Sequence, residues 1–139
     1  ITDFDFGAAT GVTTVDQLDL SGVIDDNNMS VGDANFGDGN ETISTTLAED
    51  NDVTILTGQT YADTDAVDSA FEGLTATGNV NDQIAIWQDT FGDAHVSYVN
   101  DDNNADGADN YTVTDVFKLE GVSVAGLSDV VDAGDFIVG

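Results

Sequence analysis

The sequence predicts an all-β domain, either a β-sandwich or β-roll-like, with at most one short helix. Short runs of β-branched and aromatic residues recur along the chain, and the first two alternate between apolar and polar residues. Gly, Asn and Asp, which favour turns, lie between these runs. Short strands separated by polar turns are typical of sandwich and roll architectures.

Seven segments are expected to form strands, in chain order 1–6, 15–20, 53–56, 83–88, 95–99, 111–119 and 136–138. One helix is expected over residues 63–74. Its apolar residues form a single stripe at helical spacing: Ala66, Val67, Ala70, Phe71 and Leu74. Asp63 or Thr64 is expected to cap the start of this helix, and Gly73 lies near its end.

Length and composition fit one folded domain over residues 1–139. The chain has 40% hydrophobic residues, enough for a core. No apolar stretch approaches the roughly 18 residues of a membrane span. Because the sequence begins at Ile1 rather than Met, we expect that an N-terminal part was removed, either by processing or by excision from a longer protein.

The charge of the chain is its most unusual property. One Lys and no Arg stand against 28 acidic residues, which gives a formal net charge of −27. Such a chain repels nucleic acid and anionic lipid, so neither is an expected partner. The absence of Cys and the presence of a single His argue against zinc. Ca²⁺, which takes 6 to 8 oxygen ligands, is therefore the expected ion.

An acidic surface that only keeps the protein soluble, or adapts it to salt, is the alternative to calcium binding. The arrangement of the acids favours calcium. Asp outnumbers Glu by 24 to 4, and the Asp residues gather with Asn and Gly at the expected turns, in segments 25–28, 38–41 and 101–107.

The segment 36–43 reads FGDGNETI and resembles one copy of the RTX nonapeptide G-G-x-G-x-D-x-U-x. In that repeat, carbonyl groups and an Asp ligate calcium while the apolar residue points inward. Here Phe36 replaces the first Gly and Glu41 replaces the Asp. A second copy at 78–84, GNVNDQI, keeps the Asp and the apolar residue but has Val80 in place of the second Gly. Two such copies do not make a parallel β-roll, because consecutive repeats must stack.

Both ends of the chain are similar to the C-terminal module of RTX-type, type I secreted calcium-binding proteins, as in serralysin-type proteases and bacterial S-layer proteins. The opening, ITDF at 1–4 and VDQLDLS at 15–21, resembles I-x-D-F … D-x-I-D-L-S. The closing half, YVNDDN at 98–103, VFKLEGV at 116–122 and DFIV at 135–138, resembles Y-x-x-D-x-N … I-x-L-x-G-V … D-F-I-V. The resemblance implies secretion and calcium-induced folding, and it implies no catalytic activity.

The strongest predicted metal loop is segment 102–107. Positions 1, 3, 5 and 6 of the D-x-[DN]-x-[DN]-G calcium loop are filled by Asp102, Asn104, Asp106 and Gly107. Position 12 is Val113 instead of a bidentate Glu, so an EF-hand is excluded. Further oxygens are expected from the Ala108 carbonyl, from Asp109 or Asp115, from a distant strand or from water. The same residues also favour an ordinary hairpin turn without an ion.

Two further groups of carboxylates and amides are candidate calcium ligands. The first group is Asp3, Asp5, Asp16 and Asp19. The second group is Asp33, Asn35 and Asp38, to which Glu41 of the RTX-like segment is added. Alternation places Asp3 and Asp5 on one strand face, which is equally compatible with a solvated face.

No catalytic constellation emerges from the sequence. Any two of so many acids could form a carboxylate pair, so their number carries no specificity. Alternation makes His95 and Ser97 ordinary residues of one strand face rather than two members of a triad. Trp87, Tyr98 and Phe91 could stack on a sugar, although a single Trp in such a strand is more often a core residue.

We therefore expect no enzyme but an extracellular, calcium-binding structural module, either secreted or on the cell surface. It would self-assemble with further copies of itself into a surface layer, fibre or matrix. A carbohydrate-binding or adhesive module of a larger secreted protein, with a surface polysaccharide as partner, is the alternative.

Overall fold

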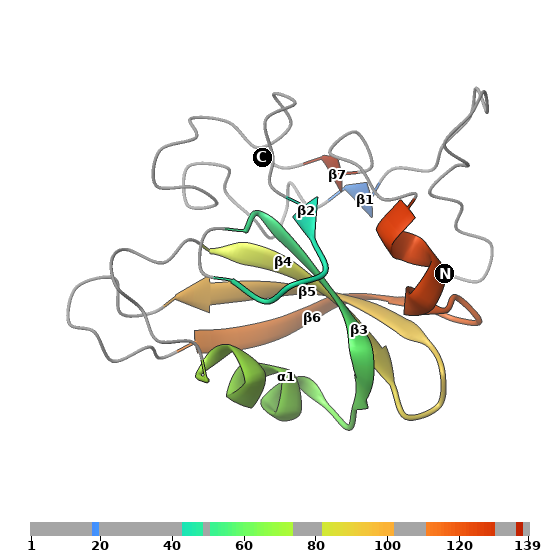
Figure 1. Cartoon of the computed structure of the whole chain (residues 1–139), viewed down its shortest axis with the longest axis horizontal. Coiled ribbons are helices and arrows are strands. Elements are labelled where there is room, and N and C mark those ends of the chain that lie inside the picture. The colour runs from blue at the N-terminus through green and yellow to red at the C-terminus, as the bar shows by residue number, and fades with distance from the viewer. Residues whose placement is uncertain are drawn as a thin grey trace.

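A computed structural model describes residues 18–19, 43–48, 51–73, 82–101, 111–129 and 136–137. The expectation of an all-β fold with at most one short helix is confirmed. Five strands form one mixed sheet in the order β2-β3-β4-β5-β6. Their bounds are β2 Ile43–Ser44, β3 Val53–Tyr61, β4 Gln83–Asp89, β5 Ala94–Asp101 and β6 Tyr111–Leu119. Two further short strands, β1 Leu18–Asp19 and β7 Phe136–Ile137, pair in parallel with each other (Figure 1).

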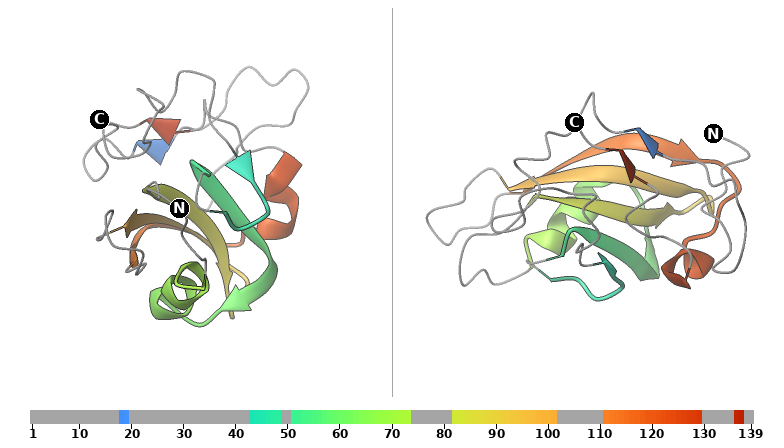
Figure 2. Two further views of the ribbon diagram at one scale, coloured as in Figure 1. Left: turned by 60° about the vertical axis from the view of Figure 1, so that its left-hand side comes forward. Right: turned by 90° about the horizontal axis from the view of Figure 1, so that it is seen from above.

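The sheet combines a crossover unit with a meander. β3 and β4 are parallel neighbours, and the helix α1, Thr64–Phe71, lies in the connection that such a pair requires. β4, β5 and β6 then follow as antiparallel neighbours. Figure 2 shows the sheet curving around α1.

The helix α1 begins where the sequence predicts. The Asp63 side chain is the N-cap and accepts a hydrogen bond from the Ala66 amide at 3.0 Å. Val67 and Phe71 of the predicted stripe are fully buried against the sheet, with Ala66 and Ala70 packed beside them, whereas Leu74 lies outside the described residues. Among the described residues, no helix is long and apolar enough to cross a membrane.

Alternation along the strands divides the core between the two faces of the sheet. The face that packs on α1 buries Leu56, Tyr61, Ala85, Trp87, Val99 and Tyr111. The opposite face buries Val53, Ile55, Ile84, Ile86, Ala94, Val96 and Leu119. A 3₁₀ helix, η2 Val124–Asp129, packs Val124 and Leu127 against this second face. Each face of the sheet is thus contacted by apolar side chains of one helix, α1 on the first face and η2 on the second.

Two irregularities interrupt the pairing. Between Leu56 and Thr60, β3 contains three exposed residues, 57–59, that have no counterpart on β4. In β6 one extra residue, Val116, separates the pairs Val96↔Phe117 and Ser97↔Asp115. Val116 and Phe117 are consecutive, yet both pack against the same core cluster. This β-bulge determines which side chains of β6 reach the site described next.

Candidate functional site

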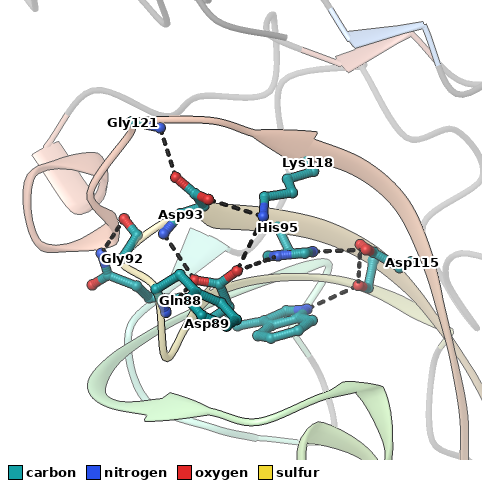
Figure 3. Close-up of polar contacts among 11 residues, drawn as sticks. Gln88, Asp89, Gly92, Asp93, His95, Asp115, Lys118 and Gly121 are labelled. Atoms are coloured by element: carbon teal, nitrogen blue, oxygen red, sulfur yellow. Dashed lines mark hydrogen bonds and ion pairs between the residues drawn. The ribbon is translucent and has the colours of Figure 1, made fainter.

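The most distinctive polar cluster of the described residues lies at the β4–β5 turn and is organised by Asp89, the last residue of β4 (Figure 3). The Asp89 carboxylate accepts hydrogen bonds from the amides of Phe91 and Asp93 at 2.8 and 2.9 Å. The backbone closes the same turn twice, from the Asp89 amide to the Asp93 carbonyl and from the Gly92 amide to the Asp89 carbonyl. Asp89 therefore holds the turn in place through both its side chain and its backbone.

Gly92 is required by the shape of this turn. Its φ of +96° lies in the left-handed region that residues other than Gly rarely adopt. The Gln88 amide group caps the turn by donating to the Gly92 carbonyl at 2.8 Å. The turn is thus held by hydrogen bonds on both sides.

Both basic side chains of the whole sequence contact Asp89. Lys118 Nζ lies 3.3 Å from Asp89 Oδ2, and His95 Nε2 lies 3.2 Å from the same oxygen. Lys118 also pairs with Asp93 at 2.9 Å, and the Gly121 amide donates to Asp93 at 2.8 Å. A chain of net charge −27 has thus brought its one Lys and its one His to the same carboxylate.

These contacts control the ionisation of the cluster. Burial alone would raise the pKa of the Asp89 carboxyl. The Asp93 amide, His95, the Phe91 amide and Lys118 together outweigh that effect and hold the pKa well below its usual range. The Gly121 amide and then Lys118 lower the pKa of Asp93. Asp93 in turn raises the pKa of Lys118, so the ion pairs favour the charged form of each partner.

His95 lies between two carboxylates and against an aromatic ring. Its Nδ1 lies 2.7 Å from Asp115 Oδ2, on the opposite side of the ring from Asp89. The two ring nitrogens of His95 thus face carboxylate oxygens of two different residues. The ring stacks on Trp87 with a centroid distance of 4.3 Å and an interplanar angle of 17°.

The bulge at Val116 makes this arrangement possible. Residues 115 and 118 are three apart, so regular alternation would place them on opposite faces of the sheet. Because one residue is extra, Lys118 pairs with His95 while Asp115 pairs with Ser97, and both lie on the His95 face. Without such a bulge, Asp115 and Lys118 could not both serve this cluster.

The hydrogen bonds of Ser97 do not pair a nucleophile with a base. The Ser97 hydroxyl donates to Asp115 Oδ1 at 3.2 Å and accepts from Trp87 Nε1 at 2.9 Å. Ser97 is fully buried. A triad would need this hydroxyl to contact His95 and to meet a substrate. The cluster is thus arranged to neutralise charge and to hold the turn.

The three aromatic residues considered for sugar stacking do not share a surface. Trp87 is 2% exposed and lies on the face that packs on α1. Tyr98 packs against the core of the opposite face. Phe91 stands at the turn and is 88% exposed. The three side chains therefore form no common stacking surface, and Trp87 is a core residue.

A second polar group lies at the other end of the strands. Asp82, just before β4, is buried and accepts hydrogen bonds from the Tyr98 hydroxyl and, at 3.2 Å, from the Asn100 amide group. Asp52, just before the parallel strand β3, is also buried, and its carbonyl accepts from the Ile84 amide. Both carboxylates therefore lie at the end of the sheet where β5 stops and β6 starts.

Most of the predicted calcium ligands lie outside the described residues. This applies to Asp3, Asp5, Asp16, Asp33, Asn35, Asp38, Glu41, Asp102, Asn104, Asp106 and Asp109. Asp19 is described as backbone in β1, and Asp115 contacts His95 and Ser97. Within the described ranges, no three His, Cys, Asp or Glu residues form a group that could hold a metal ion.

Comparisons with models of protein families, with curated protein sequences and with solved structures find no match to this chain.

Sequence reasoning missed the cluster around Asp89, although composition contains a signal for it. A chain with a single Lys and a single His has only two positions where a side chain can neutralise a carboxylate. Asp89 and Asp93 flank the predicted turn just before His95, and Lys118 lies in the following strand. The bulge that brings Asp115 to the same face has no sequence signature that we recognise.

Proposed function

We propose that the chain is an extracellular calcium-binding structural module, exported by a type I system, that self-assembles into a surface layer, fibre or matrix. The observation that best supports this function is the separation of charge along the sheet. Both basic side chains lie at the β4–β5 turn, whereas the buried carboxylates of Asp52 and Asp82 lie at the other end. At about 3.3 Å per residue, the seven steps from Asp82 to Asp89 span roughly 23 Å.

A distance of that size weakens any neutralisation of the far end by Lys118 or His95. The buried Asp82 carboxylate is stabilised by hydrogen bonds from the Tyr98 hydroxyl and the Asn100 amide group, but these neutral donors do not cancel its negative charge. The chain has no other basic side chain to offer. A divalent cation bound near that end would supply two positive charges and would suit carboxylate and amide oxygens.

The predicted ligand loop is attached to this same end. The last described pair of β5 and β6 is Asp101↔Tyr111, so nine residues, 102–110, join the two strands. An ordinary hairpin needs only two to five residues. The remaining length leaves room for a ligand loop, and Asp102, Asn104, Asp106 and Asp109 are the candidate ligands within it.

Calcium-linked folding is the first test. An ion that binds only the native state at 100 times its dissociation constant adds about 2.7 kcal/mol per site. Thermal unfolding followed by circular dichroism should therefore give a much higher midpoint in calcium than in chelator. Coincident midpoints would reject calcium binding and favour an acidic surface that serves solubility or salt adaptation.

Self-assembly is the second test. Purified protein should form large ordered species in calcium, and should stay monomeric in chelator and in sodium at matched ionic strength, by sedimentation and electron microscopy. Sodium screens the repulsion between copies but does not bridge carboxylates. Monomers in all three solutions would reject assembly, and saturable glycan binding by such a monomer would favour the carbohydrate-binding alternative.

A further inference from the structure

The 3₁₀ helix η2 is attached to the second face of the sheet, opposite α1, by two apolar side chains. Val124 and Leu127 are 1% and 5% exposed and pack on the buried cluster of that face. The helix lies against β3 and β4. Four fully buried side chains of these two strands belong to the same cluster: Val53, Ile55, Ile84 and Ile86. The helix η2 therefore helps to close this apolar face to water.

The position of η2 in the chain differs from that of α1. The helix α1 lies in the crossover between β3 and β4, so it cannot leave the sheet without pulling on both strands. The helix η2 follows β6, the last strand of the five-stranded sheet. A 3₁₀ helix has poor hydrogen-bond geometry and is usually shorter than the six residues of η2. Detachment of η2 therefore breaks no strand pair of the five-stranded sheet.

One carboxylate fixes the direction in which the chain leaves β6 toward η2 (Figure 3). Asp93 Oδ1 accepts a hydrogen bond from the Gly121 amide at 2.8 Å, and Asp93 Oδ2 pairs with Lys118 Nζ at 2.9 Å. Lys118 is the last residue but one of β6, and Gly121 is the second residue after that strand. Asp93 thus joins the end of β6 and the start of the connection to η2 to the β4–β5 turn.

Gly121 forms a sharp turn in this connection. Its φ of +76° lies in the left-handed region, and the Val122 amide donates to the Leu119 carbonyl at 3.3 Å. Apart from the chain neighbours of Gly121, no atom lies within 4 Å of the place that a Cβ would take there. Besides this turn, the bond to Asp93 is the contact among the described residues that ties Gly121 to the sheet.

We propose that residues 122–129, which contain η2, are a strap that opens from the second face while the five-stranded sheet stays folded, and that Asp93 holds this strap shut. Opening uncovers the apolar side chains of β3 and β4 on that face. It breaks the contacts of Val124 and Leu127 and the bond from Gly121 to Asp93. Segments with few buried apolar contacts are the ones that open locally. This strap depends neither on calcium binding nor on self-assembly.

Hydrogen exchange at low urea concentrations tests whether the strap opens by itself. The full chain is placed in deuterated buffer with calcium chloride and with urea below the unfolding transition, and proteolytic fragments report each element. The amides of residues 124–129 should exchange at a rate that hardly changes with urea, because a local opening exposes little surface. The amides of β4 and β5 should exchange faster as urea rises, because they need global unfolding. An equal dependence on urea in both segments would overturn the strap.

The variant Asp93→Ala tests the role of Asp93. It removes the carboxylate but keeps the backbone groups through which Asp93 closes the β4–β5 turn. Loss of a hydrogen bond to a charged group predicts that η2 exchanges about ten- to hundredfold faster than in the wild type. A dye that fluoresces on exposed apolar surface should also bind more strongly to the variant. Asp93→Asn keeps an acceptor for the Gly121 amide, so its effect should be smaller.

Glu120→Gln is the matched control, because it changes an exposed acid of the same connection. It should exchange like the wild type. If Asp93→Ala leaves the exchange of η2 unchanged, Asp93 does not hold the strap. If Glu120→Gln speeds the exchange of η2 as much as the Asp93 variants do, the loss of a negative charge explains the effect and the role of Asp93 is rejected. Should Asp93→Ala fail to fold, the comparison of Asp93→Asn with Glu120→Gln decides between the same outcomes.

Discussion

Asp89 combines two roles at the scale of single residues. Its Oδ1 accepts from the amides of the turn, and its Oδ2 faces Lys118 and His95. Each oxygen therefore serves a different part of the structure, one the backbone of the turn and the other the side chains of Lys118 and His95. A change at this residue affects both the turn and the charge balance of the sheet end.

The variant Asp89→Asn should separate these roles, because the amide oxygen can still accept from the backbone while the charge is lost. We expect the free energy of unfolding at pH 7 to fall by about 2 kcal/mol, the range of hydrogen bonds to charged groups. Since the folded-state pKa of Asp89 is lowered, its contribution is present above the usual Asp value near 3.9 and is lost as pH falls through the folded value.

The measurement is urea unfolding of Asp89→Asn at several pH values. The difference between wild type and variant should be full at neutral pH and shrink only in acid below about pH 4. Glu120→Gln, at an exposed acid, is the control for loss of a charge alone. An equal loss of stability in both variants would contradict a special role of Asp89.

The surroundings of Asp68 shift the pKa of its carboxyl in the opposite direction to that of Asp89. Burial, then Glu72 and Asp65, raise its pKa, and its Oδ1 has no hydrogen-bond partner among the described residues. The folded state thus favours the neutral form, so the charged carboxylate costs stability at pH 7. We expect Asp68→Asn to raise the free energy of unfolding by about 0.5 kcal/mol, because it removes like-charge repulsion at i,i+3 and i,i+4.

Chemical denaturation at pH 7 and at pH 4 checks the Asp68→Asn variant. The gain should be largest at pH 7 and decrease at lower pH, where the wild-type carboxyl gains its proton. Asp65→Asn serves as the control in the first turn of α1, where a negative charge is favourable. A loss of stability in Asp68→Asn would show that the carboxylate has a favourable partner.

At the scale of elements, hydrophobic period and turn chemistry predict most of the described structure. The helix starts at its predicted cap, Asp63, and the strand predicted over 111–119 has those bounds. The strand predicted over 53–56 extends to Tyr61, because residues 57–60 are exposed and polar and carry no apolar signal. The segment β2 has only two residues, too few for any periodicity.

The candidate site depends on features that hydrophobic periodicity along the sequence does not predict. The side chains of His95 and Ser97 fall on one face as alternation predicts. The arrival of Asp115 and Lys118 on that same face depends on the bulge, and register between strands is a tertiary property. The parallel pairing of β3 with β4 likewise depends on how α1 packs, which local sequence does not encode.

The segment 102–110 gives the prediction that belongs to a single element. The double variant Asp102→Ala with Asp106→Ala should bind one calcium ion fewer per chain. Its melting temperature should fall in calcium and stay unchanged in chelator, because the two proposed ligands would act only through the ion. Calorimetry or native mass spectrometry counts the ions. An unchanged count would leave the segment as an ordinary turn.

At the scale of the whole molecule, the net charge of −27 opposes compaction. The described ion pairs gather at one end of the sheet, so they relieve this repulsion only locally. The rest of the repulsion is long-range and depends on the ions in solution. The stability of the fold should therefore respond to salt even where no specific site is filled.

This leads to a prediction in chelator. Raising sodium chloride from 0.01 to 0.1 M shortens the screening length from about 30 to about 10 Å. The melting temperature in chelator should rise over that range. In saturating calcium the same titration should have a smaller effect, because ions bound at the proposed calcium sites would lower the net charge. A melting temperature that does not change with sodium chloride would contradict repulsion as the dominant cost.

The pairing of β1 with β7 has a mechanical consequence. The two strands are parallel, with Leu18 opposite Phe136 and Asp19 opposite Ile137. A pull on the chain before β1 and after β7 acts at opposite ends of this pair. The hydrogen bonds are then loaded together in shear, whereas an antiparallel pair pulled from one end would open one bond at a time. In a layer or fibre under tension, the β1–β7 pair would bear the load first. Its two strands would separate before the five-stranded sheet is stretched.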